Sequence, residues 1–165
     1  VELMAVVVIS SILAVAGIAM FRRHISASRS VEANSVMQAI RGGEESYLAE
    51  NHVYLNVSTG TAWYPAAPST SRHAWRMSTH PDFAAWMQLA PVVNRSVMYG
   101  YLVNAGTPGT TMPKLQVANG PDLSKPQPLD WYLIQASGDT DGNGVFSRFA
   151  STSITGEIYS ENDSE

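Results

Sequence analysis

Residues 1–21 read VELMAVVVISSILAVAGIAMF, an apolar run with a single charged residue, Glu2, close to its start. A helix rises 1.5 Å per residue, so the run of about 19 residues from Leu3 to Phe21 covers roughly 28 Å, the hydrocarbon thickness of a bilayer. A carboxylate at the rim of such a run is costly in lipid unless it meets a positive charge. The stretch therefore predicts a long apolar helix, with Glu2 either at the water interface or paired inside an assembly.

The helical pattern continues beyond this run but changes character. Residues 22–52 contain no proline, and charged residues separate the apolar ones. The apolar residues recur at helical spacing: Ile25, Val36, Met37, Ile40, Tyr47 and Leu48. We therefore expect one helix, apolar all round over residues 1–21 and amphipathic over residues 22–52, where it packs on a globular part. Gly17 is its soft point, because glycine costs up to about 1 kcal/mol relative to alanine.

The rest of the chain predicts a loop region followed by a sheet. Residues 53–95 are expected to form loops and one short helix from Pro81 to Leu89, because proline suits the first helical turn. Four aromatic residues are expected to build the core beneath these loops: Trp63, Tyr64, Trp75 and Trp86.

Residues 96–165 show the alternation of strands in an antiparallel sheet. The expected strands are 96–104, 130–136, 145–151 and an edge strand near 156–159, with one more at Leu115–Ala118 inside a proline-rich loop. A helix followed by hairpin-linked strands indicates the α+β class.

Composition excludes some classes of function. The net charge of −4 argues against nucleic acid as the main partner, and the absence of cysteine excludes disulfides and thiolate metal sites. The histidines, His24, His52, His73 and His80, are scattered without ligand spacing. No nucleophile motif or phosphate-binding loop occurs, and the pair Glu44-Glu45 is expected on a solvated helix face. We therefore do not expect an enzyme.

The first residues resemble a known family. Val1-Glu2-Leu3-Met4, followed by Val6-Val7-Val8-Ile9 and Ile12-Leu13-Ala14, is similar to the N-terminus of type IV pilins and the related pseudopilins. Tyr47-Leu48-Ala49-Glu50-Asn51, with Tyr54 after it, resembles the way that family ends its long helix. The specific match covers residues 1–55, and beyond them only the general layout of a loop and an antiparallel sheet agrees.

This resemblance implies a pilin-like subunit stored in the bacterial inner membrane and then polymerised by the assembly machinery into an extracellular helical filament of identical subunits. It implies that Glu2 pairs with the N-terminal amine of a neighbouring subunit, a terminus that is methylated in the family. The helix-core contacts would come from Leu3, Val6, Val7, Ile9, Ile12 and Leu13. Because Glu2 is present, the main repeating subunit is favoured. The alternatives are a pseudopilin of a secretion apparatus, a minor pilin, or a membrane-anchored periplasmic binding module.

The chain departs from the family pattern at three places. The three residues that the family has before Val1 are missing, so we expect that Val1 is not the mature terminus. The family's helix-breaking proline falls at Ala19, and a common glycine falls at Ser11. Many pilins have a disulfide that holds their C-terminal region, but this chain has no cysteine, so other contacts must hold that region.

One turn has the pattern of a cation site. Asp139, Asp141 and Asn143 alternate and are followed by Gly144, as in the first half of an EF-hand loop. The twelfth position is Ala150 rather than glutamate, which excludes a true EF-hand. Two interpretations of this stretch stay open. It is either a hairpin turn that uses Asp, Asn and Gly for positive φ, or a turn that binds Ca²⁺ as a cofactor.

Overall fold

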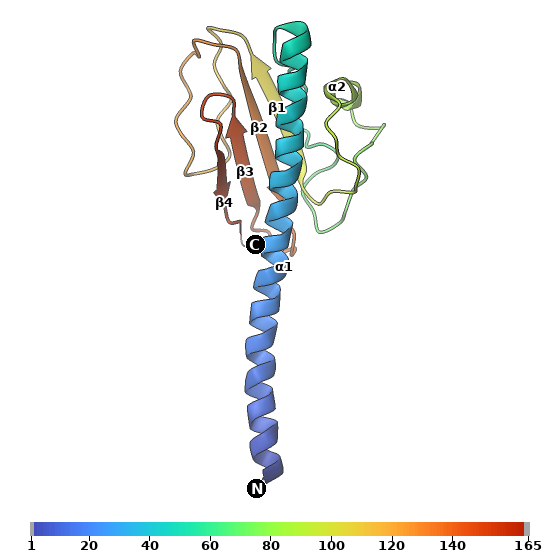
Figure 1. Ribbon diagram of the computed structural model, residues 1–165, viewed down its shortest axis with the longest axis vertical. Coiled ribbons are helices and arrows are strands. Elements are labelled where there is room, and N and C mark those ends of the chain that lie inside the picture. Colours follow the sequence, from blue (N-terminus) through green and yellow to red (C-terminus); the bar gives the residue numbers. More distant parts are fainter. Residues whose placement is uncertain (1, 164–165) are drawn as a thin grey trace.

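The computed structural model describes residues 2–163, apart from the side chains of residues 2, 19 and 22–27. Helix α1 (Glu2–Asn51) has 50 residues and is continuous through Gly17. Its first half projects away from the rest of the molecule, and its second half lies against a sheet (Figure 1). The helix ends where His52 turns to a positive φ of 60° and its N–H donates to the carbonyl of Leu48. The prediction of one long helix is confirmed, and the helix ends one residue before the predicted residue 52.

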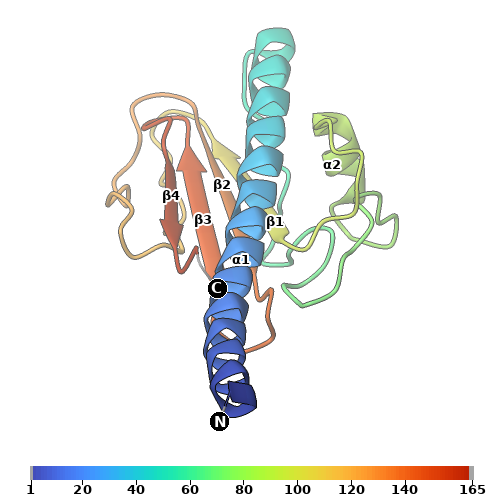
Figure 2. The same ribbon diagram turned by 60° about the horizontal axis from the view of Figure 1, so that its bottom comes forward.

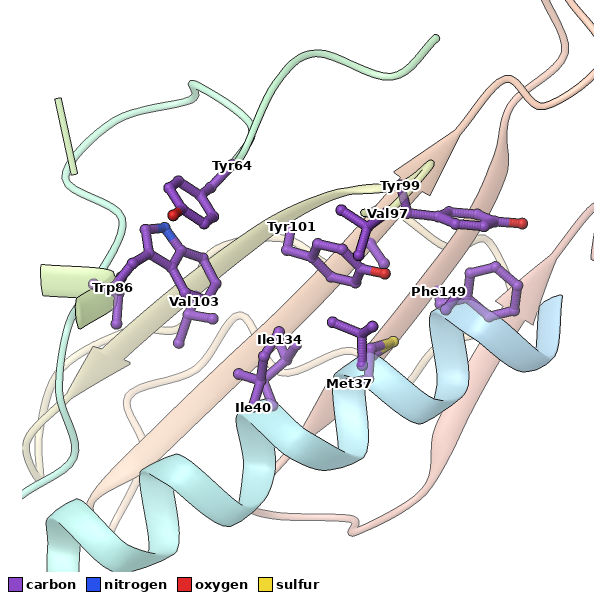
Figure 3. Packing of buried hydrophobic residues seen from close by; sticks show 14 of the residues in the cluster. Met37, Ile40, Tyr64, Trp86, Val97, Tyr99, Tyr101, Val103, Ile134 and Phe149 are labelled. Carbon is purple, nitrogen blue, oxygen red and sulfur yellow. The ribbon is translucent and has the colours of Figure 1, made fainter. Parts of the chain in front are cut away.

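The second half of α1 buries a single stripe of side chains. Ala33, Val36, Met37 and Ile40 are each at most 3 % exposed. Residues three and four apart lie on the same side of a helix, so these four form one apolar face. They belong to the main core cluster with Tyr101, Ile134 and Phe149 of the sheet, toward which Met37 and Ile40 point in Figure 3. Of the apolar residues that the sequence singled out, Val36, Met37 and Ile40 lie on this face. Tyr47 and Leu48 are half-buried, and the side chain of Ile25 lies outside the described residues.

The sheet has four strands in chain order, each antiparallel to the next. The strands are β1 (Gly100–Gly106), β2 (Trp131–Gly138), β3 (Ser147–Thr152) and β4 (Ile158–Glu161). The α+β class with an N-terminal helix and an antiparallel sheet is therefore confirmed. Strand β1 begins four residues later than the predicted 96–104, because Val97 pairs instead with His73 of the preceding loop.

Strand β2 is buried over its whole length because both faces of the sheet are covered. Tyr132 and Ile134 belong to the cluster under α1, whereas Trp131 and Leu133 belong to a second cluster on the opposite face. That second face is covered by the loop between β1 and β2, through Met112, Leu115 and Val117. The predicted strand at Leu115–Ala118 is wrong: the Gln116 N–H donates to the side chain of Gln135 at 2.8 Å, and the segment joins no ladder.

Residues 52–99 and helix α2 (Phe83–Leu89) lie on the other side of α1 from β4, as both views show (Figures 1 and 2). Tyr64 stacks on Trp86 at 4.7 Å between ring centroids and meets Trp75 edge-on at 5.1 Å. The expectation that these three aromatic residues build a core is confirmed, and Trp63 is half-buried. Helix α2 begins two residues after Pro81, later than predicted.

The same loop closes the outer edge of β1. Tyr64 and Tyr101 exchange backbone hydrogen bonds of 3.0 and 2.7 Å, and the Ser58 N–H donates to the carbonyl of Val103. An uncovered strand edge is a template for pairing with other chains. The loop thus leaves β4, on the far side of the sheet, as the outermost strand (Figure 2).

The close approach of α1 and α2 predicts opposite effects for two adjacent glycines. A Cβ on Gly43 would lie 2.8 Å from the carbonyl oxygen of Leu89, whereas one on Gly42 would meet nothing within 4 Å. We expect Gly43→Ala to lower the free energy of unfolding by about 1–3 kcal/mol through overpacking. Gly42→Ala should raise it by up to about 1 kcal/mol through helix propensity. Thermal unfolding in detergent, followed by tryptophan fluorescence, measures both; equal effects would contradict the packing of α2 on α1.

Candidate assembly surface

The first half of α1 presents an apolar surface that no other described residues of the chain cover. Its large side chains are 58–82 % exposed: Leu3, Met4, Val6, Val7, Val8, Ile9, Ile12, Leu13, Val15, Ile18, Met20 and Phe21. They include every residue that the sequence assigned to helix-core contacts, and they lie on all sides of the helix. Exposed apolar patches on soluble monomers rarely exceed a few hundred Å², and larger ones mark contact with a protein or a membrane.

The polar groups within this half are satisfied locally. The hydroxyls of Ser10 and Ser11 donate to the carbonyls of Val6 and Val7, each at 2.7 Å. Such back-bonding leaves no unpaired hydroxyl on an otherwise apolar rod. A Cβ at Gly17 would meet nothing within 4 Å, so the chain itself does not require glycine there. Glu2 begins α1, but its side chain lies outside the described residues.

Over the part of the chain that the structure describes, no helix meets the length and apolarity needed to cross a membrane.

Glu32 attaches α1 to the loop side of the molecule. Its carboxylate is 7 % exposed, lies 2.7 Å from a guanidinium nitrogen of Arg72, and accepts the Met98 N–H at 2.8 Å. Arg72 also donates to the carbonyl of Ser96. One acidic side chain on the helix therefore holds the start of the sheet region and the loop before it.

Glu44 attaches the upper end of α1 to the chain that follows it. The sequence placed the pair Glu44-Glu45 on a solvated face, which is wrong for Glu44: its side chain is fully buried. One of its oxygens accepts the Leu55 N–H at 2.9 Å, and the other has no hydrogen-bond partner among the described residues. Burial raises the pKa of Glu44 to about 7, although the Leu55 N–H opposes the shift, and the nearby Glu45 adds to it.

The C-terminal region is held to α1 by hydrogen bonds where the chain offers no disulfide. Arg29 donates to the carbonyl of Thr140 at 2.7 Å, and Arg41 donates to the carbonyl of Gly156 at 3.0 Å. The hydroxyl of Ser30 donates to the carbonyl of Asp163. Three side chains on one helix thus fix the turn after β2, the turn before β4 and the residues after β4.

Hydrogen bonds between side chains and backbone N–H groups of the same segment stabilise the turn at 138–144. The carboxylate of Asp139 accepts the N–H groups of Gly142 and Gly144, and Asp141 accepts the N–H of Asn143. Gly142 and Gly144 have φ values of +79° and +82°, which glycine adopts without strain. The turn joins β2 to β3, as the hairpin-turn interpretation expects, but the glycines alone supply its positive φ values. Ca²⁺ binding by Asp139, Asp141 and Asn143 stays a prediction.

Two of the described histidines, His73 and His80, have side-chain partners within the loop region. His73 shares a 3.2 Å hydrogen bond with Ser69, His80 accepts the Asp82 N–H, and His52 is exposed at the end of α1. The side chain of His24 lies outside the described residues. Within the described part of the chain, no group of three or more histidine, aspartate or glutamate residues could hold a metal ion.

Comparison of the chain with protein-family models, with curated proteins and with solved structures finds no match.

The buried carboxyl of Glu44 predicts an unusual dependence of stability on pH. The folded pKa of about 7 lies above the ordinary glutamate pKa of 4.5, so the folded state holds a proton that the unfolded state releases between these pH values. Stability should therefore fall as pH rises through this window, by a total of about 3 kcal/mol. Chemical denaturation at pH 5 and pH 8 measures the fall. Glu44→Gln should flatten it and Glu45→Gln should not; an equal slope in all three proteins would contradict the burial of Glu44.

Proposed function

We propose that this chain is a structural subunit of a type IV pilus-like helical filament, assembled through the first half of α1. The observation that carries the proposal is the projecting apolar half-helix, whose large side chains are more than half exposed in the isolated chain. Covering apolar surface gains roughly 25 cal/mol per Å², so this rod gains much by packing against other apolar helices. The resemblance of residues 1–55 to type IV pilins supplies the kind of assembly.

The two halves of the molecule would have separate roles in such a filament. The apolar halves of many subunits would form the filament core, while the sheets and the loops around them would form its outer surface. When two different patches on identical subunits bind each other, each added subunit is rotated relative to the last. Unless these rotations close a ring, the contact generates a helical polymer. Before assembly, the same half-helix would keep the subunit in the inner membrane.

Glu2 would set the register of the polymer. An unpaired carboxylate in an apolar core costs several kcal/mol, so a subunit would settle where Glu2 meets the N-terminal amine of its neighbour. Such a pair contributes more to the choice of one arrangement than to net stability.

Replacement of Glu2 tests this proposal. We expect Glu2→Ala to abolish filaments while the protein persists as a membrane-inserted monomer, because the substitution removes the charge that fixes register and leaves the apolar surface intact. Electron microscopy of surface fibres and fractionation of membranes measure the two outcomes. Glu45→Ala, at an exposed position on the far half of the same helix, is the matched control and should form normal fibres.

Normal fibres from the Glu2→Ala protein would contradict the pairing of Glu2. A wild-type protein that forms no fibres and stays a detergent-soluble monomer would favour the membrane-anchored binding module instead.

A further inference from the structure

Charge is divided unequally between the two sides of α1. The loop side, residues 52–99, contains three arginines, Arg72, Arg76 and Arg95, and one acidic residue, Asp82. Asp82 is 5 % exposed and accepts a hydrogen bond from Thr59, so it adds little negative charge to the surface. The sheet side, residues 100–165, contains eight acidic residues and three basic ones. The loop side is therefore a cationic surface and the sheet side an acidic one.

The two surfaces face in opposite directions. In both views the loops and α2 lie on one side of α1, and β4 lies on the other (Figures 1 and 2). The C-terminal residues after β4 reach the helix at Ser30, and the loop side reaches it at Glu32. Asp163 and the loop side are thus held at similar heights along α1, whereas Gly156, which precedes Glu157, is held farther along the helix by Arg41.

The cationic surface, defined by Arg76 and Arg95, carries two guanidinium groups without a carboxylate partner among the described residues. The two arginines line one cleft of about 350 Å³, together with Trp75, Val93 and Ser96. Both side chains are exposed, and among the described residues neither lies within 4.0 Å of a carboxylate. Arg72, by contrast, is already paired with Glu32. Two guanidinium groups beside an apolar wall form a surface that fits carboxylates on a partner.

The acidic surface, defined by Glu157 and Asp163, lies at the two ends of β4. Both residues are exposed and flank the outermost strand of the sheet. Glu161 between them accepts the Ala118 N–H and lies opposite Arg148 in the β-ladder, so its charge is partly engaged. The carboxylate of Asp163 accepts a hydrogen bond of 3.4 Å from the hydroxyl of Ser160. Glu157 and Asp163 are the exposed carboxylates that flank this edge strand, and both can meet a cation from outside.

We propose that, in the filament, the cationic surface of one subunit docks on the acidic surface of a second copy of the chain. This inference rests on the proposed function, because only a polymer needs both surfaces at once. Complementary charges attract unlike surfaces, and like surfaces repel, which disfavours a closed two-fold dimer. The contact runs side to side, outside the apolar core, and each subunit uses one surface of each kind. Exposed charge pairs weaken with salt, so the contact is sensitive to ionic strength.

Charge reversal tests this contact in the full-length protein. Arg76→Glu with Arg95→Glu should reduce fibre yield at least tenfold, and Glu157→Arg with Asp163→Arg should do the same. A chain that carries all four substitutions has both surfaces reversed, so it should polymerise again. Thermal unfolding of each detergent-extracted monomer checks that the variants are folded.

A control variant separates the contact from net charge. Lys114→Glu with Lys125→Glu changes the net charge by the same amount as the arginine pair, but on exposed residues of the sheet side. It should form fibres at near wild-type yield. Loss of fibres in this control as well, or failure of the four-fold variant to regain them, would overturn the contact.

The outcome also distinguishes this inference from the proposed function. Wild-type fibres together with undiminished fibres from the arginine variant would overturn the contact and leave the filament intact. Because the natural chain has no cysteine, Ser96→Cys with Ile154→Cys, two exposed positions beside the two surfaces, allows a direct cross-linking test that leaves all four charges in place. Mild oxidation of its fibres should give a ladder of disulfide-linked multimers, and either cysteine alone should give none; the absence of a ladder from the double variant would count against the contact.

Discussion

A single helix, α1, packs on the sheet with one half and leaves the apolar side chains of its other half exposed, and the rest of the structure depends on this division. Its second half lies on the sheet through the stripe from Ala33 to Ile40, which is almost completely buried. Its first half projects from the rest of the molecule (Figure 1), and its large apolar side chains have no such partner among the described residues. Apolar burial is the main favourable term in folding and association, so one half stabilises the fold and the other is left for association.

Polar side chains on α1 organise the irregular parts of the molecule. Glu32 and Glu44 each accept a backbone N–H from the chain beyond the helix, and Arg29 and Arg41 each donate to a backbone carbonyl near the C-terminus. Each bond fixes a loop or a turn rather than another helix or strand. The loops and turns are thereby attached to the same helix that carries the apolar half.

Much of the fold could be predicted from periodicity, because a change from helical spacing to alternation is visible in the sequence. The end of α1 to within one residue and the existence of all four strands followed from it. The prediction failed at Leu115–Ala118, where apolar side chains cover a sheet without joining its ladder. Apolar alternation alone does not separate these two arrangements.

The burial of Glu44 could not be predicted from its residue type. Its charge suggested solvent, yet it lies four residues after Ile40, at the next position of the buried stripe. Spacing was the signal that could have placed it, and the need of Leu55 for an acceptor could not be seen before the turn after α1 was known. The side chain of Glu2, the residue on which the assembly mechanism depends, lies outside the described residues, so its role is an inference from sequence.

The measurement that tests the central claim most directly is a cryo-electron microscopy reconstruction of fibres purified from cells that express the chain. The account predicts a helical array in which residues 3–21 of every subunit pack in the interior and the sheets form the outer surface. Fibres whose apolar half-helices face the solvent, or a protein found solely as membrane-bound monomers, would contradict it.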